Sequence, residues 1–212
     1  MKEKGVGEMK KIIILGFLFL FLASQTWSQE KCEAPVWKVG DKWTYKDATG
    51  ATFSSEVMDV KEDVFVVKNT ENQSVGAIDK KTMNLKYVIG SGGQKIKPTG
   101  VLKKFTDFPL FVGKKWTDNF TVETRRGIQQ QIDIMCDFKV EDIVEVKTPA
   151  GTFKAYVIYL KQGTQVYGGR YGWMRRWYSP EVKAWIKREY EKSDYWVESR
   201  MHDAELISFE LK

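Results

Sequence analysis

Hydrophobic and polar residues alternate with a period of two along much of the chain after residue 28. The clearest stretch is 132–140, where the even positions hold Ile, Cys, Phe and Val and the odd positions are mostly Asp and Lys. Successive side chains of a β-strand point to opposite faces, so this pattern predicts a long strand with one buried face. The stretches 83–89 and 207–211 alternate in the same way and predict two further strands.

Turn-forming residues separate the predicted strands. They include Asp47-Ala-Thr-Gly50, Ser91-Gly-Gly93, Thr148-Pro-Ala-Gly151 and Ser179-Pro180. Short strands at this spacing, rich in β-branched and aromatic residues, predict an all-β domain, either an antiparallel β-sandwich or a partly open barrel. Only 193–205 leaves room for a short helix.

A short segment occurs twice and indicates that the β domain is built from two related halves. Val39-Gly-Asp-Lys-Trp-Thr44 recurs 73 positions later as Val112-Gly-Lys-Lys-Trp-Thr117, with five of the six residues identical. We therefore predict an internal repeat whose halves are about 36–100 and 101–212.

Two weaker similarities accompany this repeat. Val60-Lys-Glu-Asp-Val64 has a counterpart in Val140-Glu-Asp-Ile143, and the segment 78–88 resembles 178–188. We expect each half to contribute a meander of strands to a shared core.

The first 28 residues predict an export signal. Met9-Lys-Lys supplies basic residues, 12–23 is an apolar stretch of 12 residues, and Thr26-Trp-Ser28 places small residues where cleavage needs them. This order is typical of a secretory signal peptide, and we expect cleavage after Ser28 to release 29–212 as a single β domain. Because the signal is complete from Met9 onward, we hypothesise that residues 1–8 precede the true start.

The apolar stretch is too short to predict a membrane anchor. Spanning a bilayer takes about 20 apolar residues, whereas this stretch has the length of a signal-peptide core. A lipid-modified N-terminus at Cys32 is not expected either, because Lys31 stands where a small residue is needed. We therefore expect a mature protein without a transmembrane anchor, periplasmic or secreted.

The charge balance excludes few partners. The chain has 34 Lys and Arg against 28 Asp and Glu, and the first 28 residues hold four of the basic and two of the acidic residues, which leaves 30 against 26, or +4. Basic and acidic residues are interleaved, as is typical of a solvated surface. This mild charge and the export signal argue against nucleic acid as a partner.

The two cysteines, Cys32 and Cys136, leave two alternatives open. An oxidising exported setting would allow one disulfide between them, although a domain of this size does not need one. Because Cys136 falls on the apolar face of the strand predicted over 132–140, a buried thiol is the other alternative.

Side chains that carry catalysis or bind metals are sparse. His202 is the only histidine and lies in a polar stretch, so a zinc site or a His-dependent nucleophile has little support. Paired acids such as Glu141-Asp142 fall at predicted strand ends, and nothing in the sequence places two carboxyl groups across one cleft. We predict no metal, no cofactor and no catalytic residues.

The segment 167–196 is the most distinctive candidate surface, because aromatic residues alternate there with Arg and Lys. Its rings could stack on a sugar or lipid while arginines fix an anionic group. Alternatively the rings form cross-strand pairs and core that basic side chains cover, which we favour because aromatic residues are common in strands. The candidate ligand-binding residues are Tyr171, Trp173, Arg175, Arg176, Trp177, Tyr178 and Trp185.

Two segments of the second half carry a resemblance to a known family. Residues 145–155 contain Thr-Pro-Ala-Gly-Thr-Phe and 177–187 begin with Trp-Tyr-Ser-Pro. In both features the chain resembles exported bacterial all-β domain proteins of uncharacterised role. Pro149 and Gly151 suit a turn there, after which Phe153 re-enters the core. The resemblance implies a secreted or periplasmic all-β fold and no known catalytic residues.

These observations favour a non-enzymatic binding or scaffold domain of the cell envelope. Its partner would be an envelope protein, a glycan or a lipid. One alternative is a carrier that holds a hydrophobic or lipid ligand in a β-barrel cavity. A second alternative is a hydrolase that acts on a cell-wall polymer.

Overall fold

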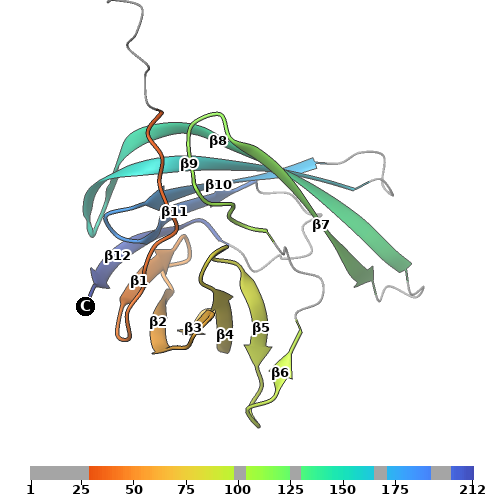
Figure 1. Ribbon diagram of the computed structural model, residues 1–212. Helices are drawn as coiled ribbons and strands as arrows, with labels where there is room; N and C mark the ends of the chain where they lie inside the picture. The colour runs from red at the N-terminus through yellow and green to blue at the C-terminus, as the bar shows by residue number, and fades with distance from the viewer. Residues whose placement is uncertain (1–28, 98–103, 125–129, 165–170, 192–201) are drawn as a thin grey trace, which may run out of the picture. The chain divides into compact units, whose positions relative to one another are not determined.

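Antiparallel β-strands make up the regular structure of this protein (Figure 1). The computed structural model describes residues 29–97, 104–124, 130–164, 171–191 and 202–212, and within these ranges it contains strands and no helix. The predicted all-β class and the antiparallel pairing are therefore confirmed.

The first six strands form one meander, in which each strand pairs with the next along the chain. Their bounds are β1 Lys42–Asp47, β2 Thr52–Val60, β3 Val64–Asn69, β4 Ser74–Asp79, β5 Leu85–Ile89 and β6 Lys95–Ile96.

The last six strands form a second meander of the same kind, with longer strands at its start. Their bounds are β7 Lys115–Thr124, β8 Gln130–Thr148, β9 Gly151–Thr164, β10 Tyr171–Ser179, β11 Ala184–Tyr190 and β12 Ala204–Glu210.

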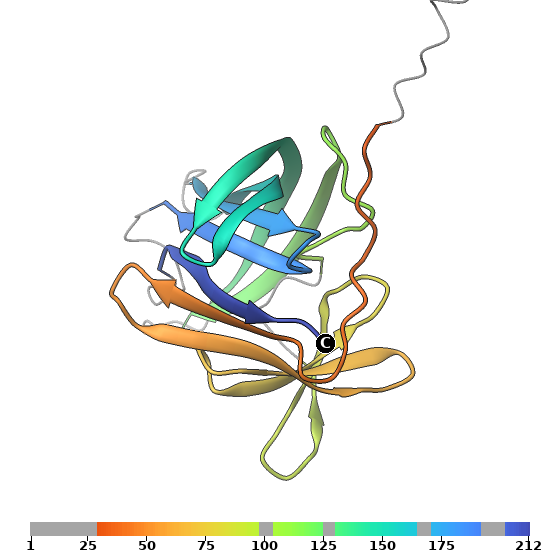
Figure 2. The same cartoon turned by 90° about the vertical axis from the view of Figure 1, so that its left-hand side faces the viewer.

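The two meanders are joined side by side into one sheet by β1 and β12 (Figure 2). The resulting strand order is β6-β5-β4-β3-β2-β1-β12-β11-β10-β9-β8-β7, so β6 and β7 are the two edges and the sheet does not close. The molecule thus contains one twelve-stranded antiparallel sheet, and this sheet is open.

Buried side chains form two hydrophobic clusters. The first lies mainly on β7 to β10 and is covered by Leu110, Phe105 and Phe108 from the segment before β7. The second joins β1, β2 and β3 to β11, β12 and the connected ends of β8 and β9. On β9, Phe153 and Ala155 belong to the second cluster and Ile158 to the first, so the two faces of this strand pack into different cores.

The twice-occurring Val-Gly-x-Lys-Trp-Thr segment has the same local structure in both places. Gly40 and Gly113 have φ angles of +88° and +87°, and their N–H groups donate to Val57 O and Val140 O at 2.9 Å in each case. The indole N–H of Trp43 donates to a backbone carbonyl, as does that of Trp116, at 2.7 and 2.9 Å. The glycine and the tryptophan of the two segments therefore make equivalent hydrogen bonds at the start of β1 and of β7.

The sequence comparison pairs Val140-Glu-Asp-Ile143 with the segment 60–64, but the structural counterpart begins three residues earlier, at Val57. β2 has a register shift between Val57 and Asp59, and β8 has one between Val140 and Asp142. In each strand the aspartate side chain then accepts a hydrogen bond of 2.8 Å from the next backbone N–H. The structural counterpart is therefore 57–60, whereas most of 60–64 forms the β2–β3 turn.

The segments 78–88 and 178–188 correspond position by position. β4 and β10 have register shifts between Ala77 and Ile78 and between Trp177 and Tyr178, 100 positions apart. In the turns that follow, Met83 and Lys183 have φ angles of +56° and +59°, unusual for residues other than glycine. The turns that follow β4 and β10 thus share a left-handed residue, and the register shifts before them lie at matching positions.

The predicted strands are observed with changes at their ends. In β8, Ile134, Cys136, Phe138 and Val140 are buried while Met135 is 51% exposed, as the alternation predicts. The strand predicted from residue 83 begins at Leu85 instead, because Met83 occupies the left-handed turn. A short helix was considered for 193–205, but 204 and 205 belong to β12. Residues 192–201 lie outside the described residues.

We predict that the positive φ angles of Gly40 and Gly113 are needed for stability. Because side chains bearing a Cβ are strained at these angles, Gly113→Ala should lower the free energy of unfolding by about 1 kcal/mol. A Cβ at Gly113 would meet no atom within 4 Å, so this variant isolates backbone strain, while Gly40→Ala adds a contact of 3.3 Å with the Lys212 side chain.

Denaturant unfolding would measure both variants against Gly92→Ala, because the φ angle of Gly92 itself is not positive and a Cβ there would meet only the flexible Gln94 side chain. Equal stability of Gly92→Ala and Gly113→Ala would contradict the assigned role.

Candidate functional site

The structure divides the predicted ligand-binding residues between the two faces of β10. Trp173, Arg175 and Trp177 alternate with Arg176 and Tyr178, so the two sets point to opposite sides of the strand. Trp185 is contributed by β11. Tyr171 begins β10, but its side chain lies outside the described part of the molecule. The seven residues therefore do not form one surface.

On the face with Trp173, Arg175 and Trp177, basic side chains lie over aromatic rings. The guanidinium of Arg175 lies 5.4 Å from the Tyr159 ring, and its Nε is 3.1 Å from a Glu141 carboxylate oxygen. Lys187 Nζ lies 5.0 Å above the ring of Trp177. Cations on this face thus have rings or carboxylates as partners.

On the opposite side, an irregularity of β11 brings Trp185 against the first meander. Because Trp177 pairs with Lys187 and Tyr178 with Trp185, Ile186 has no pairing partner in β10. The indole of Trp185 stacks on the ring of Tyr45 at 3.8 Å between centroids and 12° between planes. The Tyr45 hydroxyl donates a 3.0 Å hydrogen bond to Trp185 O, which fixes the two residues together.

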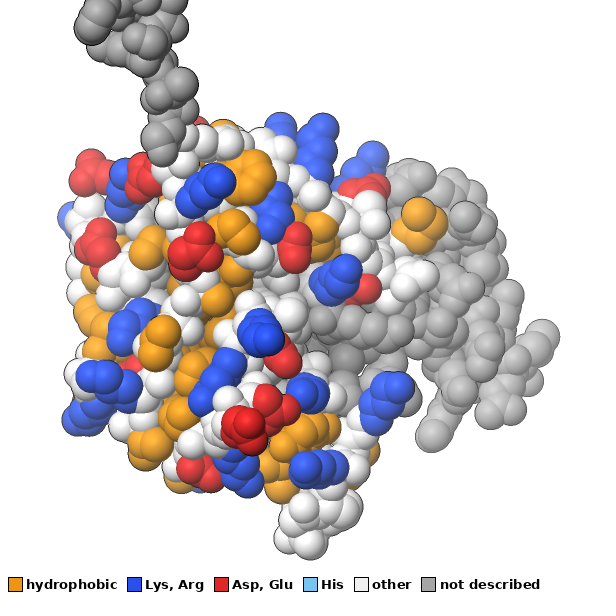
Figure 3. Space-filling view, in the orientation of Figure 1, with side chains coloured by type: hydrophobic (Ala, Val, Ile, Leu, Met, Phe, Trp, Pro, Cys, Tyr) orange, Lys and Arg blue, Asp and Glu red, His pale blue; other side chains and the backbone are white. Residues whose placement is uncertain are grey.

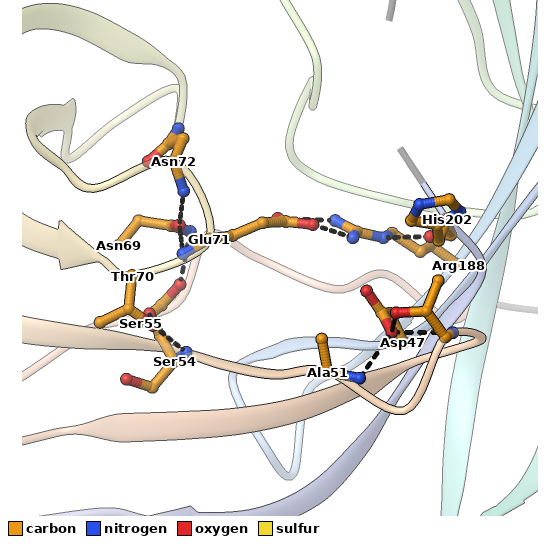
Figure 4. A network of polar contacts seen from close by, with 11 residues as sticks. Asp47, Ala51, Ser54, Ser55, Asn69, Thr70, Glu71, Asn72, Arg188 and His202 are labelled. Atoms are coloured by element: carbon orange, nitrogen blue, oxygen red, sulfur yellow. Dashed lines mark hydrogen bonds and ion pairs between the residues drawn. The ribbon is translucent and has the colours of Figure 1, made fainter. Parts of the chain in front are cut away.

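Arg188 is next to this stack and is held by a carboxylate from the first meander (Figure 4). Its guanidinium donates to both oxygens of Glu71, and its Nε donates to His202 O at 3.0 Å. Burial opposes the charged form, but the hydrogen bonds and charge of Glu71 outweigh it and raise the pKa of Arg188. With only 2% of the residue exposed, Arg188 is a fully engaged structural cation.

Glu71 is positioned by the turn between β3 and β4. The side chain of Asn69 accepts hydrogen bonds from the N–H groups of Glu71 and Asn72 and donates one to Ser55 Oγ (Figure 4). Thr70 Oγ1 accepts one from Ser54 N at 2.7 Å. Side chains of Asn and Thr commonly fix turns in this way. The turn therefore aims Glu71 at Arg188.

Arg176 differs from both other arginines of this region. Its guanidinium lies 3.8 Å from the Phe105 ring centroid and 5.7 Å from that of Trp185. Among the described residues it has no hydrogen-bond acceptor and no ion-pair partner, and its Nε is buried without one. A half-buried guanidinium is thus left with only aromatic neighbours.

We call this assembly the arginine–aromatic cluster. Burial raises the pKa of Tyr45 far above its usual range, against the smaller opposite effects of Arg176 and Arg188, so its hydroxyl stays protonated. One carboxylate therefore faces two permanent cations, which leaves an excess positive charge at Arg176. The cluster comprises Tyr45, Phe53, Glu71, Phe105, Arg176, Trp185, Arg188 and Tyr190.

The equivalent positions of the first meander carry none of this chemistry. By the matching register shifts, Arg176 corresponds to Gly76, where a Cβ would approach Leu85 Cδ1 to 2.8 Å and Leu85 would have to move. The same correspondence continues along β5 and β11. Gly76, Leu85, Val88 and Gly90 stand where the second meander has Arg176, Trp185, Arg188 and Tyr190.

Other residues considered from the sequence have ordinary surroundings. His202 is exposed, and Asp63 is paired with Lys86 at 2.7 Å. Within the described ranges, no three His, Cys, Asp or Glu side chains are grouped so as to hold a metal ion. Nor do those ranges contain a helix long and apolar enough to cross a membrane. On the face drawn in Figure 3, basic and acidic side chains are interspersed.

Both cysteines are buried in the first hydrophobic cluster. In the described structure no disulfide joins Cys32 to Cys136, so of the two alternatives it shows buried thiols. Burial raises the pKa of the Cys136 thiol to about 12, with smaller contributions from Asp118 and Asp137.

Comparison of the fold with solved structures gives three similar chains from bacteria. The hypothetical lipoprotein YmcC of Escherichia coli has a TM-score of 0.45 and 8% identity, over 92% of this chain and 96% of that one. A candidate lipoprotein of Parabacteroides distasonis has a TM-score of 0.44 and 14% identity, over 86% and 100%. A candidate exported protein of Bacteroides fragilis with a YmcC-like fold has a TM-score of 0.44 and 12% identity, over 84% and 99%. No protein-family model matches the sequence, and no curated protein matches it significantly.

We predict that Cys32 and Cys136 titrate as two thiols when the unreduced protein is denatured. In the native protein at pH 8, Cys136 should react very slowly, because a pKa of about 12 leaves roughly one thiolate in ten thousand. Reaction with Ellman's reagent would measure both values, with Cys136→Ser as the control that retains one thiol. Absence of thiols from the denatured wild type would instead establish a disulfide.

We also predict unequal effects on stability for the two arginines of the cluster. Arg188→Met leaves Glu71 without its partner and should lower the free energy of unfolding by about 2 kcal/mol. Arg176→Met removes a cation that no described carboxylate balances and should change stability by less than about 1 kcal/mol. Urea unfolding would measure both, and a larger loss for Arg176→Met would show that Arg176 is a structural residue.

Proposed function

We propose that this protein is an exported domain of the cell envelope that binds a ligand through the arginine–aromatic cluster. The proposal of export is supported by the order of basic, apolar and small residues in 1–28. The Thr-Pro-Ala-Gly-Thr-Phe turn and Trp-Tyr-Ser-Pro strand, which resemble those of exported bacterial β-domain proteins, are in keeping with this compartment. Whether the domain acts in the periplasm or outside the cell is decided by fractionation.

The observation that carries the proposal is the environment of Arg176. A buried polar N–H group without a hydrogen-bonding partner costs free energy and is rare in protein interiors, and the Nε of Arg176 is such a group. Here the cost falls at one position of the second meander, while the equivalent position of the first is Gly76. Stability alone gives no reason for this difference, whereas ligand binding does.

Binding fits the cluster better than turnover. Its one described carboxylate, Glu71, is engaged by both terminal nitrogens of Arg188 and is therefore poorly placed to accept a proton. The pKa of Tyr45 is raised by burial, so this hydroxyl is equally unsuited to act as a base. What remains are donors and aromatic rings, which recognise a ligand without transforming it.

Two measurements test the proposal. The protein recovered from the extracytoplasmic fraction should begin at Gln29, and the purified mature protein should bind 8-anilinonaphthalene-1-sulfonate saturably. Arg176→Gln should weaken this binding by about tenfold, as expected for loss of a charge-assisted hydrogen bond.

Arg175→Gln is the matched control, because it removes the same side chain one position away on the opposite face of β10. Equal losses in the two variants, or no saturable binding by the wild type, would contradict the proposed site. Retention of the protein in the cytoplasm would contradict export.

A further inference from the structure

We propose that Arg176 binds an oxyanion, a carboxylate or phosphate group, in the plane of its guanidinium. This inference rests on the proposed binding function and specifies the ligand chemistry. The group could belong to an amphiphile or to a free small anion, since both present the same terminal oxygens. The argument depends on how the arginines of β10 and β11 differ in their partners.

Three arginines lie on the neighbouring strands β10 and β11, and only one is without an anionic partner among the described residues. Arg175 has Glu141, with Nε to carboxylate oxygen at 3.1 Å, and Arg188 has both oxygens of Glu71. These two show how this fold satisfies an arginine that serves its structure. Arg176 has neither a carboxylate nor a backbone carbonyl among the described residues, so an external anion would supply what its neighbours already have.

The aromatic neighbours of Arg176 leave its hydrogen-bonding edge available. Phe105, 3.8 Å from the guanidinium carbon, contacts the flat face of the group, as a cation–π partner does. The N–H groups point outward in the guanidinium plane and are not used by such a contact. Two parallel N–H groups match two oxygens of a carboxylate or phosphate, which makes this edge selective for oxyanions.

A second donor lies nearby on the same face of the sheet. Arg176 is paired with Arg188 and Met174 with Tyr190, so Tyr190 is the diagonal neighbour of Arg176 on the adjoining strand. The Tyr190 hydroxyl is buried without a hydrogen-bond partner in the structure. Unsatisfied polar groups of this kind commonly mark the place of a missing ion or ligand.

The charge of the cluster also favours an anion. Arg176 and Arg188 stand directly opposite each other, and like charges in such a pair repel. Glu71 balances only one of them, which leaves a net charge of +1 beside the rings of Trp185 and Phe105. An oxyanion at Arg176 would bring the group of three charges to neutrality.

Titration calorimetry of the mature protein with four probes tests this inference: sodium phosphate, sodium acetate, sodium oleate and oleyl alcohol. Oleate should bind at least about tenfold more tightly than oleyl alcohol, and Arg176→Gln should abolish that preference. Arg176→Lys should retain part of it, because the charge remains while the planar pair of donors is lost. Arg175→Gln should behave as the wild type.

The four probes distinguish a free small anion from an amphiphile, and they distinguish failure of the oxyanion site from failure of the proposed function. Binding of phosphate or acetate would identify a free small anion, and binding of oleate alone would identify an amphiphile. Binding of oleyl alcohol as tightly as oleate, unaffected by Arg176→Gln, would overturn the oxyanion site. In that case, saturable binding of oleyl alcohol would still support a ligand-binding function, whereas absence of binding of every probe by the wild type would overturn both proposals.

Discussion

The two meanders depend on the pairing of β1 with β12, which is the one contact between strands far apart in the sequence that the sheet needs to be continuous. β1 and β12 share six residue pairs, whereas β12 and β11 share two. The C-terminal strand is thus held more firmly by the first meander than by its own. Buried Asp41 strengthens this link, because it accepts hydrogen bonds from the N–H groups of Lys38 and Lys212.

The same juncture creates the arginine–aromatic cluster. β12 separates β1 from β11, and Trp185 and Arg188 of β11 reach Tyr45 of β1 and Glu71 beyond it. Neither meander alone has these contacts. Because the cluster contains residues of both meanders, changes in the β1–β12 pairing would alter its geometry.

Much of the fold could be predicted from local patterns, and the parts that could not have a physical cause. A period of two correctly predicts the buried face of β8 from Ile134 to Val140. It cannot foresee β-bulges, at which the period shifts, and the bulge beside Trp177 is what brings Trp185 to the side of Arg176. The predicted set of binding residues also mixed the two faces of β10, because it was chosen by residue type and not by alternation.

Long-range contacts were the second limit. Glu71 lies in an unremarkable polar turn, 117 positions from Arg188, and no local signal connects them. The missed residues Tyr45, Glu71, Arg188 and Tyr190 could be found only by placing the two meanders together. A partial signal was present, since extending the alignment of 78–88 with 178–188 by two residues sets Arg188 and Tyr190 against Val88 and Gly90, although its meaning depends on the register.

The two edge strands of the sheet, β6 and β7, follow each other along the chain. In the order β7 to β12 followed by β1 to β6, every strand would pair with its neighbour along the chain. The observed strand order is thus that of a circularly permuted up-and-down meander: β12 and β1 are neighbours in the sheet but lie at opposite ends of the chain's strand sequence. Bringing these two strands together closes a loop that spans nearly the whole domain, an entropic cost that slows folding. The contacts that join the two meanders in the binding cluster therefore depend on this one long-range pairing.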